Sequence, residues 1–289
     1  MSESAAPIVS LERQSTYWGG DVAHQWHLYG PPLRPCAADI RAMEDAVRRF
    51  ADHRGRPLNA LLWGVTPEIA TMSWPAATQL LALDKSRPMI DLVWPGDVAG
   101  FRRALQRDWF DYRCDADERH DVVIGDGNFA PLDFPESYRA LAAAASASLT
   151  DAGIVISRFW VRPPKRETPE AVFEDMRANR IRSFHAFKFR LAMALQENAE
   201  TGVAVSEVLA AWKRARVDME PLLAMTGWQR ETVDMIHLYE GKTSRLAFPS
   251  IAELEALMSE HFDTLETRYL DYELGECCPI VTYRVRGKR

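Results

Sequence analysis

A glycine and an acid, each at the end of an apolar run, are the residues of this sequence best placed to hold a ligand. Residues 59–63 form an apolar run that ends at Gly64, and residues 79–83 form a second run that ends at Asp84. A glycine turn lets the backbone approach a ligand, and an acid about 20 residues farther on is where nucleotide-binding α/β proteins hold ribose hydroxyls. Gly64 and Asp84 fit that spacing, although apolar strands that end in Asp are common.

The residues after Gly64 predict the start of a helix. Thr66 is a favourable N-cap, Pro67 suits the first helical position because no N–H is needed there, and Glu68 complements the positive helix end. A strand, a glycine turn and a helix in this order present backbone N–H groups to a ligand.

Two further polar segments follow apolar runs. A third strand is predicted at 101–107, before Asp108 and Trp109. A carboxylate beside an indole can bind an exocyclic amine and stack on its ring, but an exposed acid beside a core Trp explains the pair equally well. A fourth run, at 121–124, reads as a buried parallel strand and breaks into Gly-Asp-Gly-Asn at 125–128. Open α/β sheets place ligands at this edge.

Four side chains are candidates for a general base or for orienting a substrate. Tyr17, His24 and His27 lie in the segment 16–32, which mixes large aromatics with glycines and prolines, and His185 lies much farther along. The segment is typical of a flap over a flat ligand, because Trp and Tyr give rigid stacking surface. Docking of an N-terminal arm on the core is the other explanation, and a single histidine is more often structural.

Helices separate most of these strands. Asp39 is expected to cap a helix over 40–53, and a helix over 136–149 precedes a turn at 151–153 and a fifth strand at 154–161. Strands alternating with helices imply a mainly parallel sheet that is covered on both faces.

From 163 to 248 the pattern changes to helices alone, which are predicted over 169–180, 183–198, 205–216 and 227–240. An insertion of this kind is typically a lid or an oligomer surface. Its stretch from 177 to 190 is basic and lacks acids, which indicates a solvated helix face or a site for an anion. The basic residues are Arg177, Arg180, Arg182, Lys188 and Arg190, with His185 among them.

The C-terminal residues return to the α/β pattern. Ser250 is expected to cap a helix that reaches 261, and strands are predicted at 265–272 and 279–285. The short connection between the two strands indicates an antiparallel hairpin at or near one end of the sheet.

Composition excludes several classes of protein. The net charge of −6, from 35 basic and 41 acidic residues, disfavours a general binder of nucleic acid or of anionic membranes. The four cysteines have no CxxC spacing, so we expect neither a metal site nor disulfides. No run approaches the roughly 20 apolar residues of a membrane helix, and no signal-like segment opens the chain. We therefore expect a soluble cytoplasmic protein.

Taken together, the order of elements resembles the class I S-adenosylmethionine-dependent methyltransferases of the small-molecule type. The segments that carry the resemblance are LLWGVTPEIA, LLALD, RDW and DVVIGDGNF, and it covers about 58–162 and 250–286. It implies an α/β fold: a doubly wound, mainly parallel seven-stranded sheet with an antiparallel last strand, plus an inserted helical cap. The domains would be an N-terminal aromatic arm and helix (1–57), a cofactor-binding core (58–162), the cap (163–249) and a C-terminal helix and hairpin (250–289).

The resemblance also assigns cofactor-binding roles to residues of this sequence. This sequence departs from the family pattern at the first loop, where Gly64 is the only glycine and Trp63 replaces a small residue. By resemblance, Gly64, Val65 and Thr66 line the methionine part of S-adenosylmethionine, Asp84 holds the ribose with Lys85 and Met89 nearby, Asp108 and Trp109 hold adenine, and Asp126, Gly127 and Asn128 face the methyl donor.

Two functions are consistent with this sequence. The first is in-line methyl transfer to a small molecule, in a site that the flap and the cap close. This reaction needs positioning and desolvation, and it needs a base only when the nucleophile arrives protonated. The second is a non-catalytic or regulatory scaffold that forms a homodimer through the helical insertion. A nicotinamide dehydrogenase is disfavoured because no GxGxxG follows a strand.

Overall fold

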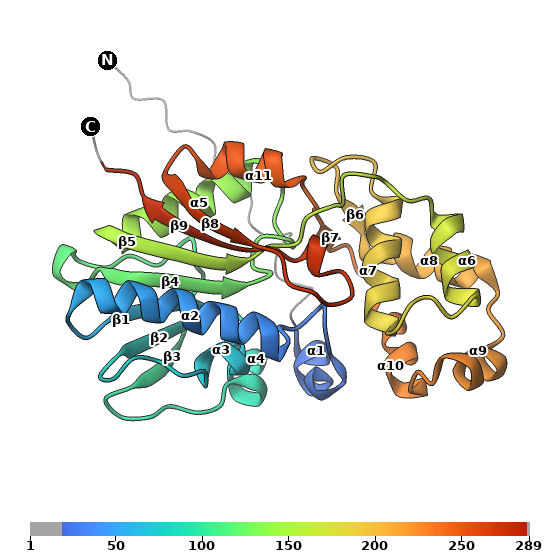
Figure 1. Ribbon diagram of the computed structural model, residues 1–289. Coiled ribbons are helices and arrows are strands. Elements are labelled where there is room, and N and C mark those ends of the chain that lie inside the picture. The colour runs from blue at the N-terminus through green and yellow to red at the C-terminus, as the bar shows by residue number, and fades with distance from the viewer. Residues whose placement is uncertain (1–18, 288–289) are drawn as a thin grey trace, which may run out of the picture.

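A mainly parallel seven-stranded sheet forms one half of the computed structural model, which describes residues 19–287 (Figure 1). The strand order is β3-β2-β1-β4-β5-β9-β8, and only β9 runs antiparallel to its neighbours. This is the sheet that the sequence predicts. The strands are β1 (Asn59–Trp63), β2 (Gln79–Asp84), β3 (Arg102–Gln106), β4 (His120–Asp126), β5 (Leu149–Arg158), β8 (Phe262–Arg268) and β9 (Ile280–Val285).

The register of the central strands brings their carboxyl ends together. Trp63 at the end of β1 pairs with Leu83 of β2 on one side and with Gly125 of β4 on the other. The apolar residues of β1 and β4 are buried on both faces, as expected for interior parallel strands. The loops that follow β1, β2 and β4 therefore start side by side.

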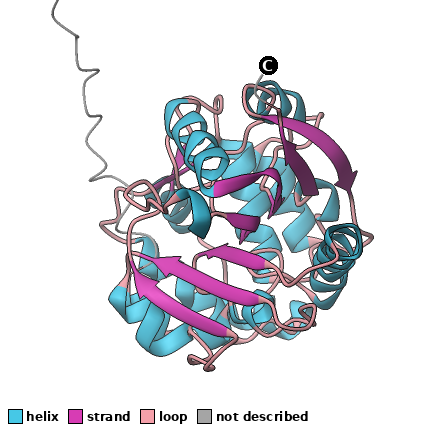
Figure 2. Cartoon of the chain, turned by 90° about the vertical axis from the view of Figure 1, so that its left-hand side faces the viewer, coloured by secondary structure: helices cyan, strands magenta, loops and turns pink. Residues whose placement is uncertain are grey.

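Helices cover both faces of the sheet, as Figures 1 and 2 show. One apolar cluster joins the sheet to α2, α3 and α4, and a second joins it to α5 and α11. The prediction that Ser250 is the N-cap residue of α11 is confirmed, because its side chain accepts a hydrogen bond from Glu253 N. These helices are α2 (Ala37–Arg54), α3 (Pro67–Ala70), α4 (Arg87–Val93), α5 (Glu136–Ser148) and α11 (Ile251–Met258).

The prediction that Asp39 is the N-cap residue of α2 was wrong. The helix starts at Ala37 with Cys36 as its N-cap, so Asp39 is the third helical residue. Asp39 still acts at the helix start, because its carboxylate accepts a hydrogen bond from Cys36 N at 2.8 Å in a capping box. Thr66 occupies the N-cap position of α3, but its side chain makes no capping hydrogen bond.

Two strand boundaries also differ from prediction, because pairing with a neighbour decides where each strand ends. Strand β5 begins at Leu149, which pairs with His120, so the turn predicted at 151–153 is an irregular part of the strand. Strand β8 spans Phe262–Arg268 instead of 265–272, because its partner β9 extends only from Ile280 to Val285.

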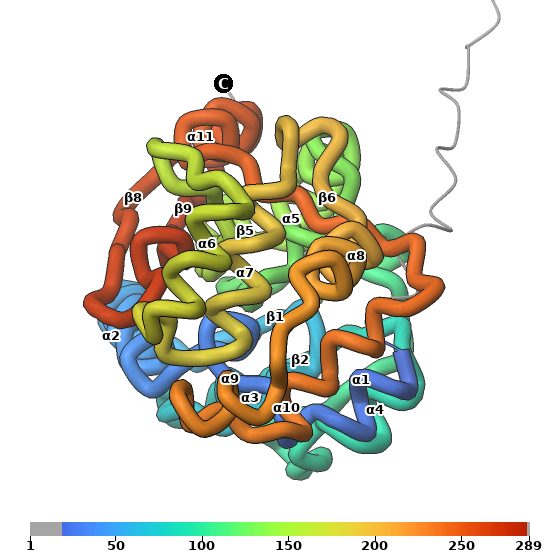
Figure 3. The backbone as a smooth tube through the Cα atoms, turned by 90° about the vertical axis from the view of Figure 1, so that its right-hand side faces the viewer, coloured from blue at the N-terminus to red at the C-terminus, as the bar shows by residue number. Residues whose placement is uncertain are grey.

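The inserted helices form a separate layer beside the carboxyl edge of the sheet (Figures 1 and 3). The single helix predicted over 227–240 was wrong: Gly227, at φ +71°, ends the unpredicted α9, and a second helix starts at Arg230. The elements are α6 (Pro169–Arg177), α7 (Phe184–Leu195), α8 (Val205–Ala215), α9 (Met219–Thr226), α10 (Arg230–Asp234), the 3-10 helix η4 (Met235–Tyr239), and the strands β6 (Val203–Ala204) and β7 (Arg245–Leu246).

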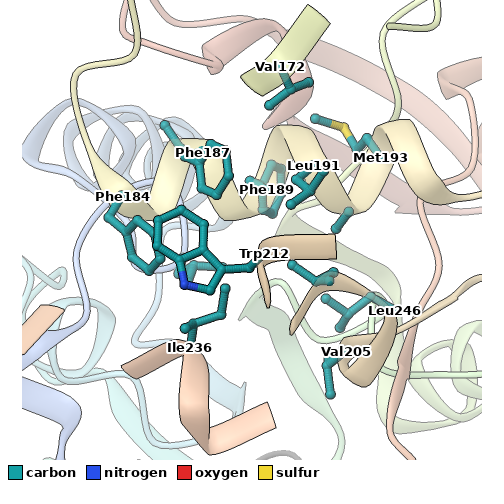
Figure 4. Packing of buried hydrophobic residues seen from close by; sticks show 14 of the residues in the cluster. Val172, Phe184, Phe187, Phe189, Leu191, Met193, Val205, Trp212, Ile236 and Leu246 are labelled. Carbon is teal, nitrogen blue, oxygen red and sulfur yellow. The ribbon is translucent and has the colours of Figure 1, made fainter. Parts of the chain in front are cut away.

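Helix α7 is the centre of this cap. Phe184, Phe187 and Trp212 pack together between α7 and α8 (Figure 4), with ring centroids 5.4–5.6 Å apart. Phe189 on α7 meets Trp160, just after β5, edge to face at 5.0 Å. The apolar core of the cap is therefore continuous with the carboxyl edge of the sheet.

Two further features of the fold are the burial of the cysteines and the hydropathy of the helices. Cys277 and Cys278 are buried free thiols, whereas Cys36 and Cys114 are half-buried. Burial raises the pKa of both buried thiols. None of the helices within residues 19–287 combines the length and the hydropathy that crossing a membrane requires.

Replacing Phe187 by Ala should lower the stability of the cap. Its side chain is fully buried and meets aromatic rings from several elements, so the cavity should cost about 3–5 kcal/mol of the free energy of unfolding. Urea denaturation measures this loss. Leu265→Ala, at a residue that is 51% exposed, should change the same quantity by less than about 0.5 kcal/mol. Equal losses in the two variants would contradict the packing described.

Candidate functional site

Hydrogen bonds join the loops at the carboxyl edge of the sheet. Gly64 N donates to Leu83 O at 2.8 Å, and the indole Nε1 of Trp109 donates to the same carbonyl at 2.7 Å. The side-chain amide of Asn128 donates to Trp63 O, also at 2.8 Å. The segments after β1, β2, β3 and β4 therefore meet at one place, which brings together most residues predicted to bind a ligand.

Two glycines shape this place in different ways. Gly64 has φ +87°, and a Cβ there would meet only Asn128 Nδ2, at 3.8 Å, among the described residues. The backbone at Gly64 is therefore open to close approach by a ligand. Gly125 is closed, because its Cβ would lie 2.0 Å from Asn128 Oδ1. Glycine at position 125 is what allows the Asn128 side chain to lie across the ends of β1 and β4.

Asn128 presents a buried acceptor to this place. Its side chain is 5% exposed, and among the described residues Oδ1 has no hydrogen-bond partner. Leaving such an atom unpaired costs about 1–3 kcal/mol, so a donor from water or from a ligand is favoured there.

Asp84 is an acid of the site that burial perturbs. It is 8% exposed, and its Oδ1 accepts a hydrogen bond from Ser86 N at 2.8 Å. Burial raises its pKa to about 6, against the opposing effects of Ser86 N–H and Lys85. None of the described basic side chains forms an ion pair with Asp84, since Lys85 Nζ lies 3.8 Å from Asp108 instead. A buried carboxylate held without a cation is characteristic of a functional site.

Asp108 and Trp109 lie beside Asp84 but differ in environment. The Asp108 side chain is 22% exposed and accepts a hydrogen bond from Phe110 N at 3.0 Å. The Trp109 ring stacks on Trp63, with centroids 6.2 Å apart. Trp63 itself is buried in the core beneath α5.

Asp126 is engaged by an arginine that sequence reasoning missed. Arg158 ends β5 and is fully buried, with Nε 2.5 Å from Asp126 Oδ1 and Nη1 3.9 Å from Asp39 Oδ2. Tyr272 OH donates to Asp39 Oδ1 at 2.9 Å. Burial raises the pKa of Asp126, while Arg158 opposes this rise. The only sequence signal was a charged residue within the predicted fifth strand, 154–161.

The predicted proton carriers do not come together. Tyr17 lies outside the described residues, and His24 and His27 are exposed, on α1 (Gly20–His24) and on the 3-10 turn η2 (Trp26–Leu28). His185 is buried on α7, and its Nε2 lies 2.8 Å from Leu28 O. Burial lowers the pKa of His185 to about 3, so it stays neutral.

The remaining predicted residues are buried or half-buried. Val65 and Met89 are buried in the apolar cluster on the α2 side of the sheet, Lys85 and Thr66 are half-buried, and Gly127 lies at φ +62°. A Cβ at Gly127 would be 2.9 Å from the Trp160 ring.

An arm formed by residues 19–35 connects the site to the cap. Arg34 pairs with Glu68 of α3 at 2.6 Å, and Asp21 lies 3.4 Å from Lys242 of the cap. Helix α1 packs beside α4 (Figure 3), and the Tyr29 ring stacks on His185 at 5.8 Å. The arm therefore passes between the α3–α4 side of the sheet edge and α7.

Asp84→Asn should stabilise the protein at neutral pH. The raised pKa means that Asp84 favours folding while protonated, and this contribution is lost as pH rises from about 4 through about 6. The variant should therefore gain up to about 3 kcal/mol in free energy of unfolding at pH 7, and much less near pH 4. Urea denaturation at both pH values, with the exposed Asp52→Asn as control, measures the difference. A variant less stable than wild type at pH 7 would contradict the burial of an unpaired charge.

Gly125→Ala should displace Asn128. The added methyl group overlaps Asn128 Oδ1, so we expect a loss of about 1–3 kcal/mol in the free energy of unfolding. Gly287→Ala is the matched control, because no described atom lies within 4 Å of its Cβ position. If both variants melt like the wild type, the placement of the Asn128 side chain is wrong.

Comparisons with known proteins identify the fold. No protein-family model and no curated protein sequence matches the chain. Among solved structures, the CcbJ methyltransferase from Streptomyces caelestis is 14% identical, with 94% of this chain and 98% of that chain covered and a TM-score of 0.51. A possible exported protein from Bordetella parapertussis is 15% identical over 94% and 80% of the two chains, with a TM-score of 0.50. The resemblance to class I methyltransferases is thus confirmed at the level of the fold.

Proposed function

We propose that this protein transfers a methyl group from S-adenosylmethionine to a small molecule, and that the carboxyl edge of β1, β2 and β4 binds the donor. The observation that carries the proposal is Asp84, a buried carboxylate at the end of β2 that has no ion pair among the described residues. Its position beside the open backbone of Gly64 supports a ligand with hydroxyl donors. The likeness of the fold to a methyltransferase supports the choice of that ligand.

The chemistry of the described residues fits the parts of the donor. A ribose offers two hydroxyl donors, and Asp84 has carboxylate oxygens to accept them. Asp108 is a half-buried acceptor for an exocyclic amine, and it lies close to Asp84 through Lys85. Asn128 Oδ1 is an acceptor without a partner in the described part of the chain, beside the Gly64 turn. Asp84, Asp108 and Asn128 Oδ1 all accept hydrogen bonds, and the hydroxyl and amine groups of S-adenosylmethionine can donate them.

The residues of this chain would then work by positioning. The bound donor supplies an electrophilic methyl group on a sulfonium, which a nucleophile attacks in line. Asp84 and Asn128 would fix the orientation of the donor, and Gly64 would let it approach the backbone. Trp160 and Phe189 would help to exclude water at the cap side of the edge, because both are buried there.

The arm and the cap would enclose the methyl acceptor. The arm is fastened at Arg34 to α3 and at Asp21 to the cap, and its Tyr29 packs on α7. Tyr29 belongs to the apolar cluster of the cap, and Trp26 packs both against that cluster and against the one on the α2 side of the sheet. This supports a role as a cover over a small, flat substrate, as the aromatic segment predicts.

Calorimetry with S-adenosylmethionine tests the proposal. Wild type should bind with a Kd in roughly the micromolar range, and Asp84→Asn should bind about 10–100-fold more weakly, because hydroxyls lose a charged acceptor. The exposed Asp52→Asn should bind as wild type does. Improved stability combined with weaker binding in Asp84→Asn is the signature of a residue kept for function.

The scaffold function predicts a different result. No heat and no change in melting temperature with wild type would reject donor binding. The fold would then belong to a scaffold, and an interface lined by residues 165–248 in a dimer would support that function.

A further inference from the structure

Lys188 on α7 is buried among aromatic rings. The residue is 3% exposed, and Nζ lies 5.8 Å from the ring centre of Tyr29, 5.5 Å from that of Phe184 and 5.4 Å from that of Tyr239. The sequence predicts a solvated face or an anion site for the basic run that contains it. Arg190 follows neither expectation, because it pairs with Glu167 and Asp175 within the chain.

The amine of Lys188 has no counter-charge within the described chain. No described carboxylate lies within 4 Å of Nζ, and the titratable groups that face it are His185 on α7, Tyr29 on the arm and Tyr239 on η4. Aromatic rings favour the ammonium form, but burial outweighs them and lowers the pKa of Lys188 to about 7. Much of the amine is therefore neutral and basic near neutral pH.

His185, one helical turn before Lys188, adds a second polar group. A carbonyl only accepts hydrogen bonds, so His185 Nε2, 2.8 Å from Leu28 O, carries the ring proton. Nδ1 is then an acceptor, and it is buried without a partner in the described residues. Both side chains lie against Tyr29 of the arm. A buried nitrogen acceptor such as His185 Nδ1 is costly to leave unpaired, so a donor from water or from a ligand is favoured there.

Packed residues connect this pair to the proposed donor site. Phe189, which follows Lys188, packs on Trp160, and the Trp160 ring occupies the space that a Cβ at Gly127, in the loop after β4, would need. Tyr29 belongs to the arm, which is fastened at its other end to α3 beside the Gly64 turn. The amine is therefore placed where the arm, α7 and η4 meet, and α7 and the arm both contact elements at the carboxyl edge.

We propose that Lys188 is the base that takes the proton of a phenolic methyl acceptor held between the arm and α7. The proposal rests on the proposed function and names its substrate class. An amine that is largely unprotonated near neutral pH can take the proton of a phenol as a general base. An aliphatic alcohol is far too weak an acid for this, and a carboxylic acid arrives already ionised. The rings of Tyr29, Phe184 and Tyr239 provide apolar walls for an aromatic acceptor.

The step balances without another reactant. The phenol O–H bond breaks and its proton moves to Lys188 Nζ, which becomes an ammonium. The phenolate oxygen forms a bond to the methyl carbon while the sulfur–methyl bond of the donor breaks. The electrons of that bond stay on sulfur, so a neutral thioether leaves, and the ammonium releases its proton to solvent when the product departs.

Absorbance titration with 4-nitrophenol tests the proton transfer independently of methylation, because only its phenolate is yellow. At slightly acidic pH, wild type should convert added probe to bound phenolate in a saturable manner. Lys188→Met should produce at least 10-fold less phenolate at the same concentrations. Lys213→Met is the matched control: this lysine is half-exposed on α8, pairs with Glu240, and should not affect the titration.

The stability of Lys188→Met checks that the variant folds. The lowered pKa means that the buried ammonium destabilises the fold fully below about pH 7, and this cost fades as pH rises toward the ordinary value of 10.5. The melting temperature of Lys188→Met should therefore exceed that of wild type by more at pH 6 than at pH 9. Lys188→Gln is the second variant, because its amide can bond to a phenol but cannot take the proton.

Two results would overturn the proposal. One is yellow phenolate formed equally by wild type and by Lys188→Gln or Lys188→Met. The other is no phenolate with wild type that binds S-adenosylmethionine in calorimetry, which would leave the methyltransferase proposal intact. Phenolate formation by a wild type that does not bind the donor would instead reject methyl transfer and keep the Lys188 site.

Discussion

The hydrogen bonds that lock the ends of β1, β2 and β4 together are the constraint on which the site depends. Gly64 N reaches Leu83 O, and the Asn128 amide reaches Trp63 O, so three loops far apart in sequence share one edge. Gly125 makes this possible, since any side chain there would collide with Asn128. The resulting edge exposes backbone at Gly64 and acceptors beside it, which is what a nucleoside-like ligand requires.

Around this edge the protein buries charged and basic groups that reduce its stability. Asp84 lacks an ion pair in the described chain, and Lys188 is held among aromatic rings. A core selected for stability alone would replace such groups with apolar side chains. Their concentration where the sheet, the arm and the cap meet favours a site that handles both a polar ligand and a proton.

Much of the fold was predictable because each strand carries its own pattern. The β-branched run of β4, the Gly64 turn and the Asp84 spacing all indicate the right sheet edge. The Asp39–Arg158 pairing was not predictable, because it joins α2 to the end of β5 only in three dimensions. Lys188 could not be assigned either: its helical position indicates an exposed face, and the arm and η4 cover that face. The start of β5 and the break before α10 depend on pairing and on Gly227, which local pattern does not reveal.

A crystal structure with S-adenosylhomocysteine, the demethylated product of the donor, tests the central claim most directly. We predict that its ribose hydroxyls lie within hydrogen-bond distance of Asp84, its homocysteine part over Gly64, and its adenine beside Asp108. Binding of the molecule elsewhere, or an edge between Gly64 and Asp84 filled by the protein's own side chains in crystals soaked to saturation, would contradict it.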